Sequence, residues 1–373
     1  MSRLLFLLLI ILQNYSLPLQ AKSVRAMWVV RYTLLDDRET DLLIRTAKKM
    51  QLTDLYVQVR ALGKFLNGAE DNSFVNPNST AHKNFKRIIN DAHKQNIRVH
   101  AWLNVFYIHS RTDSVSNETH LAHSEKTYIL RDANADSVPN IRDMKKAATE
   151  GIYIDPLNQK NYNFLVNQID YLVDSLKVDG IHLDYFRYPN QVYIFSPRGR
   201  TKFILNNYVD PVSIYENSDS MEFDIRIKME KKHKKFLKNN LTEFMANLKS
   251  NIAAKQQNIV LSVAVKPDWE LAEKDYYQDW RYWIEKDICD QVVLMNYSVL
   301  DSVFYKNILK ALDTGMANKI LVGVATYNLD TEPIIRRLQW LEKNYSSGFS
   351  LFSYNDLISK PTLINRLANM TKQ

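Results

Sequence analysis

The stretch "DGIHLDYFRYPN" (residues 179–190) begins like a buried strand and ends in polar and aromatic side chains. Ile181 and Leu183 suit the interior of a sheet, whereas Asp184 and Arg187 follow where the strand would emerge. Parallel sheets place their reactive groups at the C-terminal ends of their strands. We therefore expect Asp184 to lie on the functional rim of a parallel sheet.

Seven further apolar runs are rich in valine, isoleucine and aromatic residues, namely residues 24–32, 54–62, 97–106, 259–267, 290–298, 319–327 and 348–354. Candidate amphipathic helices separate most of these runs; in residues 165–176, for example, the apolar side chains recur at helical spacing. Eight alternating strands and helices predict a (β/α)8 TIM barrel. A doubly wound sheet is disfavoured, because none of the eight glycines forms a G-x-G-x-x-G turn.

Two polar segments interrupt this alternation, residues 107–151 after the third strand and residues 190–222 after the fourth. Loops of such length are usually either functional or disordered, and both follow the C-terminal end of a strand. We expect them to be long insertions beside the site. Because no repeat or change in composition divides the chain, residues 22–373 are predicted to form one domain.

The N-terminal segment 1–21, "MSRLLFLLLIILQNYSLPLQA", has the pattern of a secretory signal peptide, with a basic Arg3, an apolar run over residues 4–12 and the small residue Ala21. The apolar run is shorter than the roughly 20 residues that cross a bilayer. Cys289 is the only cysteine, so the sequence offers no cysteine for a lipid anchor and no internal disulfide. We expect an exported protein of the periplasm or the cell surface.

The chain is basic, with a formal net charge of +8 and a pI of about 9.2. Much of the positive charge lies in "RIKMEKKHKKFLKNN" (residues 226–240), which has a helical composition. Two interpretations are open for this segment: a solvated helix face, or a peripheral contact with an anionic wall or membrane surface. An exported chain is not expected to bind nucleic acid, and the sequence leaves the oligomeric state open.

Polar and aromatic side chains also mark the ends of the other predicted strands. They are Gln58, Arg60, Trp102, Asn104, Lys266, Asp268, Asn296, Tyr297, Tyr327, Tyr354 and Asp356. Rings that stack on sugar faces, together with amides and carboxylates that bind hydroxyls, are typical of a carbohydrate-binding cleft. We therefore predict a polysaccharide site on this rim, with Trp28, Trp102 and Trp269 as candidate stacking surfaces.

Cleavage of a glycosidic bond requires two carboxyl groups, one to protonate the leaving oxygen and one to attack or to activate water. Asp184 is the first candidate for one of these catalytic roles. The second acid is sought among the other carboxyl groups near strand ends: Asp155, Asp268, Glu270 and Asp356. Whether the enzyme would retain or invert the anomeric configuration stays open, because the sequence does not identify the second acid.

The residues around these acids have supporting roles in this prediction. His182 faces the same side of its strand as Asp184 and is expected to orient that carboxylate. Arg60 and Arg187 are expected to pair with rim carboxylates and favour their charged forms. Asp290 opens its strand at the opposite face and is expected to be structural.

Other chemistries find little support. His120 and His123 stand three residues apart in a polar insertion, but the sequence shows no third ligand, so we predict no metal site. A serine hydrolase is not expected, because the chain contains no G-x-S-x-G turn. No feature of the sequence requires a cofactor.

Several motifs resemble those of the glycosyl hydrolase-like 10 family of bacterial envelope proteins, some of which act on peptidoglycan. They are "VRAMWV" (24–29), "YVQVR" (56–60), "VHAWLN" (99–104), "DGIHLDYFRYP" (179–189) and "QDWRYWI" leading to "DQVVLMNY" (278–297). The resemblance implies a (β/α)8 barrel that hydrolyses glycan strands, with Asp184 as the acid of strand four. "IDPLN" (154–158) resembles a short segment of the family and draws attention to Asp155.

The chain departs from the family pattern in two places. The strand-four motif often has two adjacent acids, whereas Tyr185 follows Asp184 here. Many members are lipoproteins, whereas this sequence has no cysteine to modify. The favoured prediction is an exported glycoside hydrolase that cuts peptidoglycan glycan strands. The alternative is a glycan-binding protein without catalysis, and lyase or transglycosylase action would use the same carboxylates.

Overall fold

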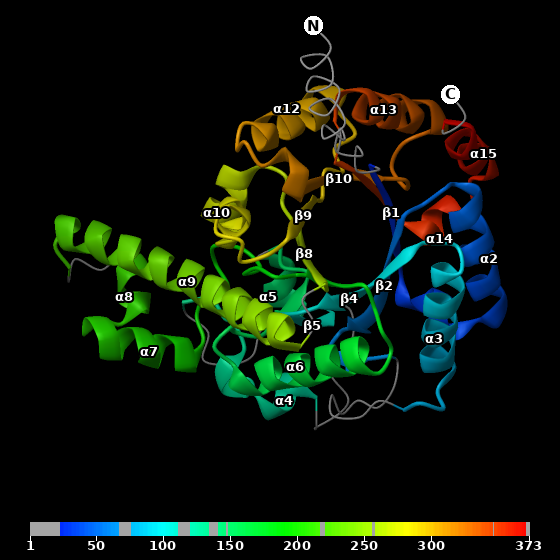
Figure 1. Cartoon of the computed structure of the whole chain (residues 1–373). Coiled ribbons are helices and arrows are strands. Elements are labelled where there is room, and N and C mark those ends of the chain that lie inside the picture. Colours follow the sequence, from blue (N-terminus) through cyan, green and yellow to red (C-terminus); the bar gives the residue numbers. More distant parts are fainter. Residues whose placement is uncertain are drawn as a thin grey trace, which may run out of the picture.

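The structure is a computed structural model, and it describes residues 23–66, 76–110, 120–133, 141–146, 148–216, 221–255, 258–345 and 347–370. Eight parallel strands form its centre: β1 (Val24–Val29), β2 (Asp54–Ala61), β4 (Arg98–Asn104), β7 (Gly180–Asp184), β8 (Val260–Val265), β9 (Gln291–Leu294), β10 (Ile320–Ala325) and β11 (Gly348–Phe352). Each strand pairs with the next, and β1 pairs with both β2 and β11, so the sheet closes (Figure 1). The predicted TIM barrel is confirmed.

Helices surround the barrel (Figure 1). The longer ones are α2 (Asp37–Lys49), α3 (Thr80–His93), α6 (Gln159–Asp174), α9 (Phe223–Lys255), α10 (Trp269–Tyr276), α12 (Asp301–Leu312), α13 (Thr331–Asn344) and α15 (Pro361–Met370). The short elements are η1 (Arg31–Leu35), β3 (Lys64–Phe65), α11 (Trp280–Glu285), η3 (Ala317–Lys319) and α14 (Tyr354–Leu357). The apolar pattern of residues 165–176 falls mainly in α6, which buries Leu165, Ile169 and Leu172. Asn158 caps its N-terminus by accepting a hydrogen bond from the Asn161 amide.

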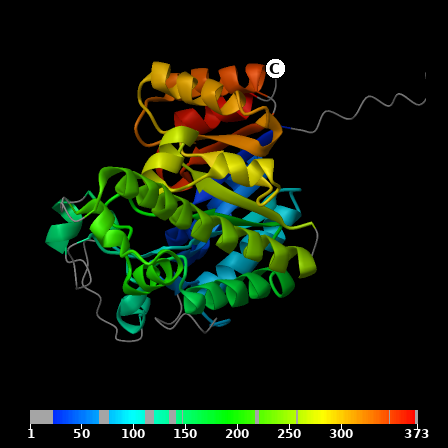
Figure 2. The same cartoon turned by 90° about the vertical axis from the view of Figure 1, so that its left-hand side faces the viewer.

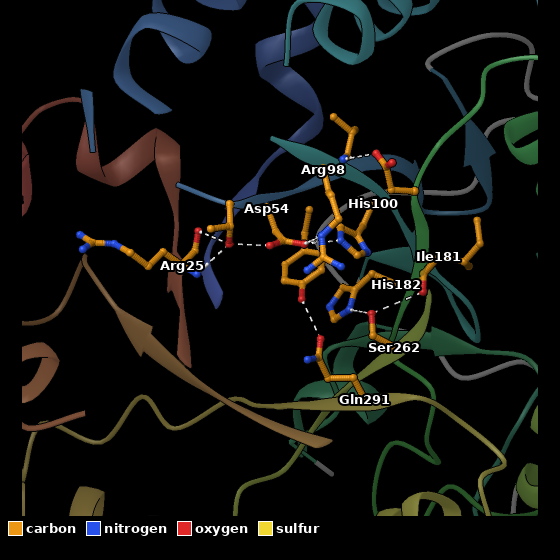
Figure 3. Close-up of polar contacts among 12 residues, drawn as sticks. Arg25, Asp54, Arg98, His100, Ile181, His182, Ser262 and Gln291 are labelled. Atoms are coloured by element: carbon orange, nitrogen blue, oxygen red, sulfur yellow. Dashed lines mark hydrogen bonds and ion pairs between the residues drawn. The ribbon is translucent and has the colours of Figure 1, made fainter. Parts of the chain in front are cut away.

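The interior of the barrel combines large apolar rings with a buried polar chain. Trp28, Tyr56 and Trp102 belong to one buried cluster. Below them, the buried Asp54 carboxylate binds His100 and Arg98 (Figure 3). Parallel pairing of β4 and β7 sets Asn104 opposite Asp184 and Trp102 opposite His182, so the polar strand ends meet at one rim.

The two long insertions lie where the sequence predicts them, and they contain structure of their own. After β4 come β5 (Tyr107–Ser110), α4 (Leu121–Ser124), η2 (Lys126–Tyr128), α5 (Ile141–Lys146) and β6 (Gly151–Tyr153). β5 and β6 pair in antiparallel fashion as a separate two-stranded sheet. After β7 come α7 (Pro197–Asn207) and α8 (Pro211–Tyr215).

The predicted signal peptide, residues 1–21, lies outside the described residues. No helix in the described parts of the chain is both long and apolar enough to cross a membrane.

Candidate active site

A cavity of about 530 Å³ opens at the C-terminal end of the barrel. The residues that line it come from strand ends and from the first insertion: Trp28, Val30, Arg31, Tyr32, Gln58, Leu62, Trp102, Asn104, Tyr107, Ser110, Glu150, Asp184, Tyr185, Arg187, Ala264, Lys266, Met295, Tyr297 and Phe352. Of the residues predicted for the site, eight meet here: Trp28, Gln58, Trp102, Asn104, Asp184, Arg187, Lys266 and Tyr297. This size and mixture of rings and polar groups suit a small segment of a sugar chain.

Asp184 is the carboxyl group at the base of this cavity. Its Oδ2 accepts a hydrogen bond from the Trp102 indole at 3.1 Å, and its Oδ1 accepts one from the Tyr185 amide at 2.7 Å. Burial raises its pKa above the ordinary value, although these hydrogen bonds and the charges of Arg187 and Lys266 oppose the rise. The carboxyl group therefore keeps its proton to higher pH than an exposed aspartate.

The backbone turns sharply directly after Asp184. Tyr185 has a φ of 50°, in the left-handed region that tyrosine seldom adopts. Its ring stacks on Tyr107 with centroids 4.5 Å apart, which ties β7 to the first insertion. Residues held in rare backbone conformations cluster at functional sites. Tyr185, which directly follows Asp184 in the sequence, thus forms part of the cavity wall.

Glu150 is the second carboxylate in the cavity, and it was not among the acids predicted from the sequence. Its Oε1 accepts a hydrogen bond from the Arg187 guanidinium at 2.7 Å, and its Oε2 accepts one from the Tyr153 hydroxyl at 3.2 Å. Burial is the largest single influence and opposes its ionisation, but the charge and hydrogen bond of Arg187, a backbone hydrogen bond and the charge of Lys266 together lower its pKa below the ordinary value. Glu150 is therefore held in the charged form.

The two carboxyl groups share the same neighbours. Asp184 and Glu150 both raise the pKa of Tyr185, and both interact electrostatically with Arg187 and Lys266. Their environments shift the two pKa values in opposite directions. Asp184 is buried beside an indole and its pKa is raised, whereas Glu150 is paired with a guanidinium and its pKa is lowered. Such a split is the usual basis for assigning one acid and one base.

Two further cations face the cavity. Lys266 is partly buried, and burial together with Arg187 lowers its pKa, although the two carboxylates oppose this. Its ammonium group lies 4.7 Å from the centroid of the Tyr276 ring. Arg31 donates to Gln58 Oε1 at 3.3 Å and to the Tyr32 hydroxyl at 2.9 Å. The three cations Arg31, Arg187 and Lys266 therefore outnumber the two carboxyl groups that line the cavity.

His182 lies deeper in the barrel than the cavity, and its contacts differ from the expected one. We expected it to orient Asp184, but its Nε2 accepts from the Trp28 indole at 3.0 Å. Its Nδ1 donates to Ser262 Oγ at 2.9 Å (Figure 3). Residues two apart on a strand face the same way but differ in depth by about 6.6 Å. His182 therefore fixes Trp28, which lines the cavity.

Replacing His182 by leucine should leave the Trp28 indole N–H without an acceptor. We expect the free energy of unfolding to fall by about 2 kcal/mol and the KM for a glycan substrate to rise, because Trp28 loses its fixed orientation. Urea unfolding and initial-rate kinetics measure the two effects. Ser262→Ala is the control, since it leaves the Trp28–His182 bond in place and should leave KM unchanged. An unaltered KM in His182→Leu would show that the orientation of Trp28 does not affect substrate binding.

Asp155 lies outside the cavity. It is buried, its Oδ2 accepts from the Ser196 hydroxyl at 2.6 Å, and its Oδ1 accepts from the Leu157 amide at 2.8 Å. Ser196 in turn caps α7 by accepting from the Gly199 amide. Asp155 thus joins the first insertion to the second.

We expect Asp155→Ala to reduce the free energy of unfolding by about 2 kcal/mol, because two buried donors lose their acceptor. Its catalytic rate should stay within a few-fold of the parent rate. Thermal unfolding and initial rates with a glycan substrate test this. A folded Asp155→Ala protein that loses its activity would restore Asp155 as a catalytic candidate.

The remaining candidates hold the scaffold around the cavity. Asp268 caps α10 and pairs with Lys310 at 2.6 Å, and Glu270 pairs with the same lysine. Asp356 accepts from the Ser353 hydroxyl. The amide of Asn296 binds the Phe304 carbonyl oxygen, and the hydroxyl of the buried Tyr354 reaches Glu39.

Arg60 is completely buried below the rim, where it donates to the carbonyl oxygens of Asn104 and Val105 and to Asn161 Oδ1. Burial lowers its pKa to about 10. The pairing of β2 with β4 shifts register between Gln58 and Arg60, so Gln58 faces the cavity while Arg60 lies outside it. This shift explains why the expected pairing of Arg60 with a rim carboxylate is replaced by contacts to backbone and amide oxygens.

The described residues contain no group of three or more histidine, cysteine, aspartate or glutamate side chains placed to hold a metal ion. Both ring nitrogens of His120 have hydrogen-bond partners, one near β3 and one in its own insertion. One contacts the Leu62 carbonyl oxygen at 3.1 Å, and the other accepts from the Ala122 amide at 3.1 Å.

A sequence model of the glycosyl hydrolase-like 10 family matches residues 23–341, which is most of the chain. The chain belongs to this family. The match confirms the resemblance that the motifs at the strand ends suggested. Among proteins with curated descriptions, none matches the sequence.

Solved structures of glycosidases share the barrel of this glycosyl hydrolase-like 10 protein. The catalytic domain of β-amylase from Paenibacillus polymyxa superposes with a TM-score of 0.58 at 11% identity, covering 90% of this chain and 93% of that one. A family GH18 chitinase from Cycas revoluta gives 0.51 at 10% identity, with coverages of 94% and 100%. A chitinase from Bacteroides thetaiotaomicron gives 0.50 at 14% identity, with coverages of 94% and 96%. At such identities the similarity shows the fold alone.

Proposed function

We propose that this glycosyl hydrolase-like 10 protein is an exported glycoside hydrolase that cleaves peptidoglycan glycan strands in the cavity formed around Asp184. The observation that supports this most strongly is the pairing of Asp184, whose pKa is raised, with Glu150, whose pKa is lowered, in one cavity. Export rests on the signal-peptide pattern of residues 1–21.

In this proposal Asp184 is the general acid. Its proton passes to the glycosidic oxygen as the bond to the anomeric carbon breaks. The Glu150 carboxylate either attacks that carbon or takes a proton from the water that does, and water supplies the new hydroxyl in both cases. Arg187 keeps Glu150 charged and in place at 2.7 Å. The anomeric configuration of the first product distinguishes the two routes.

Two features of the cavity favour peptidoglycan as the substrate: its cationic side chains and its aromatic rings. N-acetylmuramic acid carries a lactyl carboxylate when its peptide is absent, and Lys266 and Arg31 offer cationic groups in the cavity for such an anion. Starch and chitin have no carboxylate to match them. Trp28, Trp102 and Tyr297 line the same cavity and provide faces for sugar rings.

The test is digestion of three substrates by the chain from Lys22 onward: purified sacculi, peptide-free glycan strands, and the same strands with their lactyl carboxyl groups reduced to alcohols. Mass spectrometry of the products should show soluble oligosaccharides with reducing ends from the first two. The reduced strands should be cleaved at least tenfold more slowly. Asp184→Asn, purified in parallel, should release fragments at least about 10²-fold more slowly.

Other products would decide against the proposal. Anhydro ends would indicate a lytic enzyme instead of a hydrolase. Co-sedimentation with the glycan but no fragments, from a folded protein, would indicate a glycan-binding protein. Equal rates on native and reduced strands would remove the assigned role of Lys266 and Arg31.

A further inference from the structure

The N-terminal half of α9 projects beyond the ring of helices together with α7 and α8 (Figure 1). Figure 2, in which this side faces the viewer, shows α9 crossing the side of the molecule. Lys228, Lys231, Lys232 and Lys235 are exposed and follow the spacing i, i+3, i+4 and i+7, so they form one stripe. The opposite face of the helix is buried through His233 and Leu237. The stripe is therefore the solvent side of a packed helix.

A groove of about 710 Å³ runs beside this stripe, between α9 and the α10–α11 segment. Five lysines line it: Lys231, Lys234, Lys235, Lys238 and Lys274. Lys231 and Lys235 also line the adjoining hollow on the outer side of α9, so the stripe and the groove are continuous.

Each carboxylate that lines the groove pairs with a lysine, and the five lysines of the lining outnumber its three carboxylates. Glu273 and Asp279 pair with Lys238, and Glu270 pairs with Lys310. Within the described part of the chain, Lys231, Lys235 and Lys274 have no such partner. The groove therefore presents surplus positive charge to a ligand.

Aromatic side chains complete the groove. The Tyr282 ring is 42% exposed along it, and the buried Tyr277 forms part of its wall. α10 separates the groove from the catalytic cavity, because Tyr276 at its end packs against Lys266 and Arg187 while Glu273 and Lys274 line the groove. One helix thus forms a wall between two hollows that both combine cations with tyrosines.

We propose that this groove is a second glycan site, which binds a strand of an acidic, carboxylate-bearing polysaccharide. Lysine ammonium groups match its carboxylates, and the exposed Tyr282 ring supplies a face for a sugar ring. A bilayer is the less suitable partner, since a flat membrane surface does not fill a concave groove. Binding there would hold a long strand at a second point and raise its effective concentration at the cavity. The site stands independently of hydrolysis.

The test is binding of polygalacturonate at low salt to the full chain carrying Asp184→Asn, in which glycan turnover is expected to be at least about 10²-fold slower. Replacing Lys231, Lys235 and Lys274 by glutamine should weaken binding about tenfold, the effect of three exposed ion pairs of about 0.5 kcal/mol each. The control replaces three exposed lysines elsewhere, Lys83, Lys86 and Lys343, and should change binding less than twofold. Tyr282→Ser should weaken binding of polygalacturonate but not of inorganic polyphosphate, which has no sugar ring.

Three results would overturn the proposal. If the groove variant and the control variant weakened polygalacturonate binding equally, binding would reflect the overall positive charge of the protein and not a site in the groove. An unchanged affinity of Tyr282→Ser for polygalacturonate would remove the sugar contact. Anionic phospholipid vesicles that bind the chain and displace polygalacturonate would reassign the surface to the membrane. Because binding is measured in an inactive variant, a failure here is distinct from a failure of the hydrolase proposal.

Discussion

Asp184→Asn and Glu150→Gln should each lower the rate of glycan hydrolysis by about 10²- to 10⁴-fold while leaving the protein folded. The asparagine retains an oxygen that can accept from the Trp102 indole, but it has no proton to give to the leaving oxygen. The glutamine retains an oxygen for Arg187, but it has no negative charge for the anomeric carbon or the attacking water. Initial rates, with circular dichroism as the check on folding, measure the effect.

The pH dependence separates the two roles. Because the pKa of Asp184 is raised, its protonated form persists as pH rises, and activity should fall only when pH passes that raised value. Because the pKa of Glu150 is lowered, activity on the acid side should fall only when pH drops below that lowered value. Any residual activity of Glu150→Gln should lack the acid limb of this bell-shaped profile.

Asp268→Asn serves as the control, because asparagine also caps helices and Asp268 lies outside the cavity. Its rate should stay within about twofold of the parent rate, since the substitution removes no group that touches the substrate. If Asp268→Asn lost most of the hydrolysis rate and Glu150→Gln lost little of it, the second catalytic carboxylate would be Asp268, as predicted from the sequence, and not Glu150.

The barrel and Asp184 could be predicted from the sequence because they depend on local patterns. A continuous apolar run that ends in polar residues indicates a buried strand of a parallel sheet. It also indicates that the last side chain lies at the C-terminal edge of the sheet. Glu150 escaped this reasoning because it lies in a polar insertion directly before β6, away from the barrel strand ends. Its only signal is its place before the apolar "GIYI" (151–154), and its pairing with Arg187 spans 37 positions.

Arg60, His182 and Tyr354 show the limit of the two-residue period. The period tells which face of a strand a side chain occupies, but it does not give the depth of that side chain in a barrel or reveal a shift in register. His182 therefore lies deeper in the barrel than predicted, too far from Asp184 to orient it. The shift in register between Gln58 and Arg60 places the arginine outside the cavity. Tyr354 lies just beyond β11, where α14 places its hydroxyl against Glu39.

The largest effect on stability is expected from Asp54→Asn, at the opposite end of the barrel from the cavity. Asp54 is 1% exposed, and its carboxylate contacts His100 at 2.7 Å, Arg98 at 2.8 Å and the Thr53 hydroxyl at 2.6 Å. Removing the charge leaves its cationic and hydrogen-bonding partners uncompensated in the interior, which should cost about 3 kcal/mol of the free energy of unfolding at pH 7. Urea unfolding of the parent and the variant measures this difference.

The pKa of Asp54 determines how the difference in the free energy of unfolding between the parent and Asp54→Asn should depend on pH. Burial opposes the ionisation of Asp54, but the hydrogen bond and charge of His100, together with Arg98, lower its pKa below the ordinary value. A lowered pKa in the folded state adds stability above the unfolded pKa of about 4, and this stability is lost as pH falls through the folded value. The gap between parent and Asp54→Asn should therefore be widest near neutral pH and narrow steadily below pH ~4.

Asp290→Asn provides the matched control at the start of β9. Its carboxylate pairs with Lys249 and accepts from the Leu261 amide, but its side chain is 39% exposed. Solvent screens that pair, so the loss should stay below about 1 kcal/mol. If both variants lost the same free energy, or if the gap for Asp54→Asn did not depend on pH, the buried ion pair would not stabilise the barrel in the way its geometry indicates.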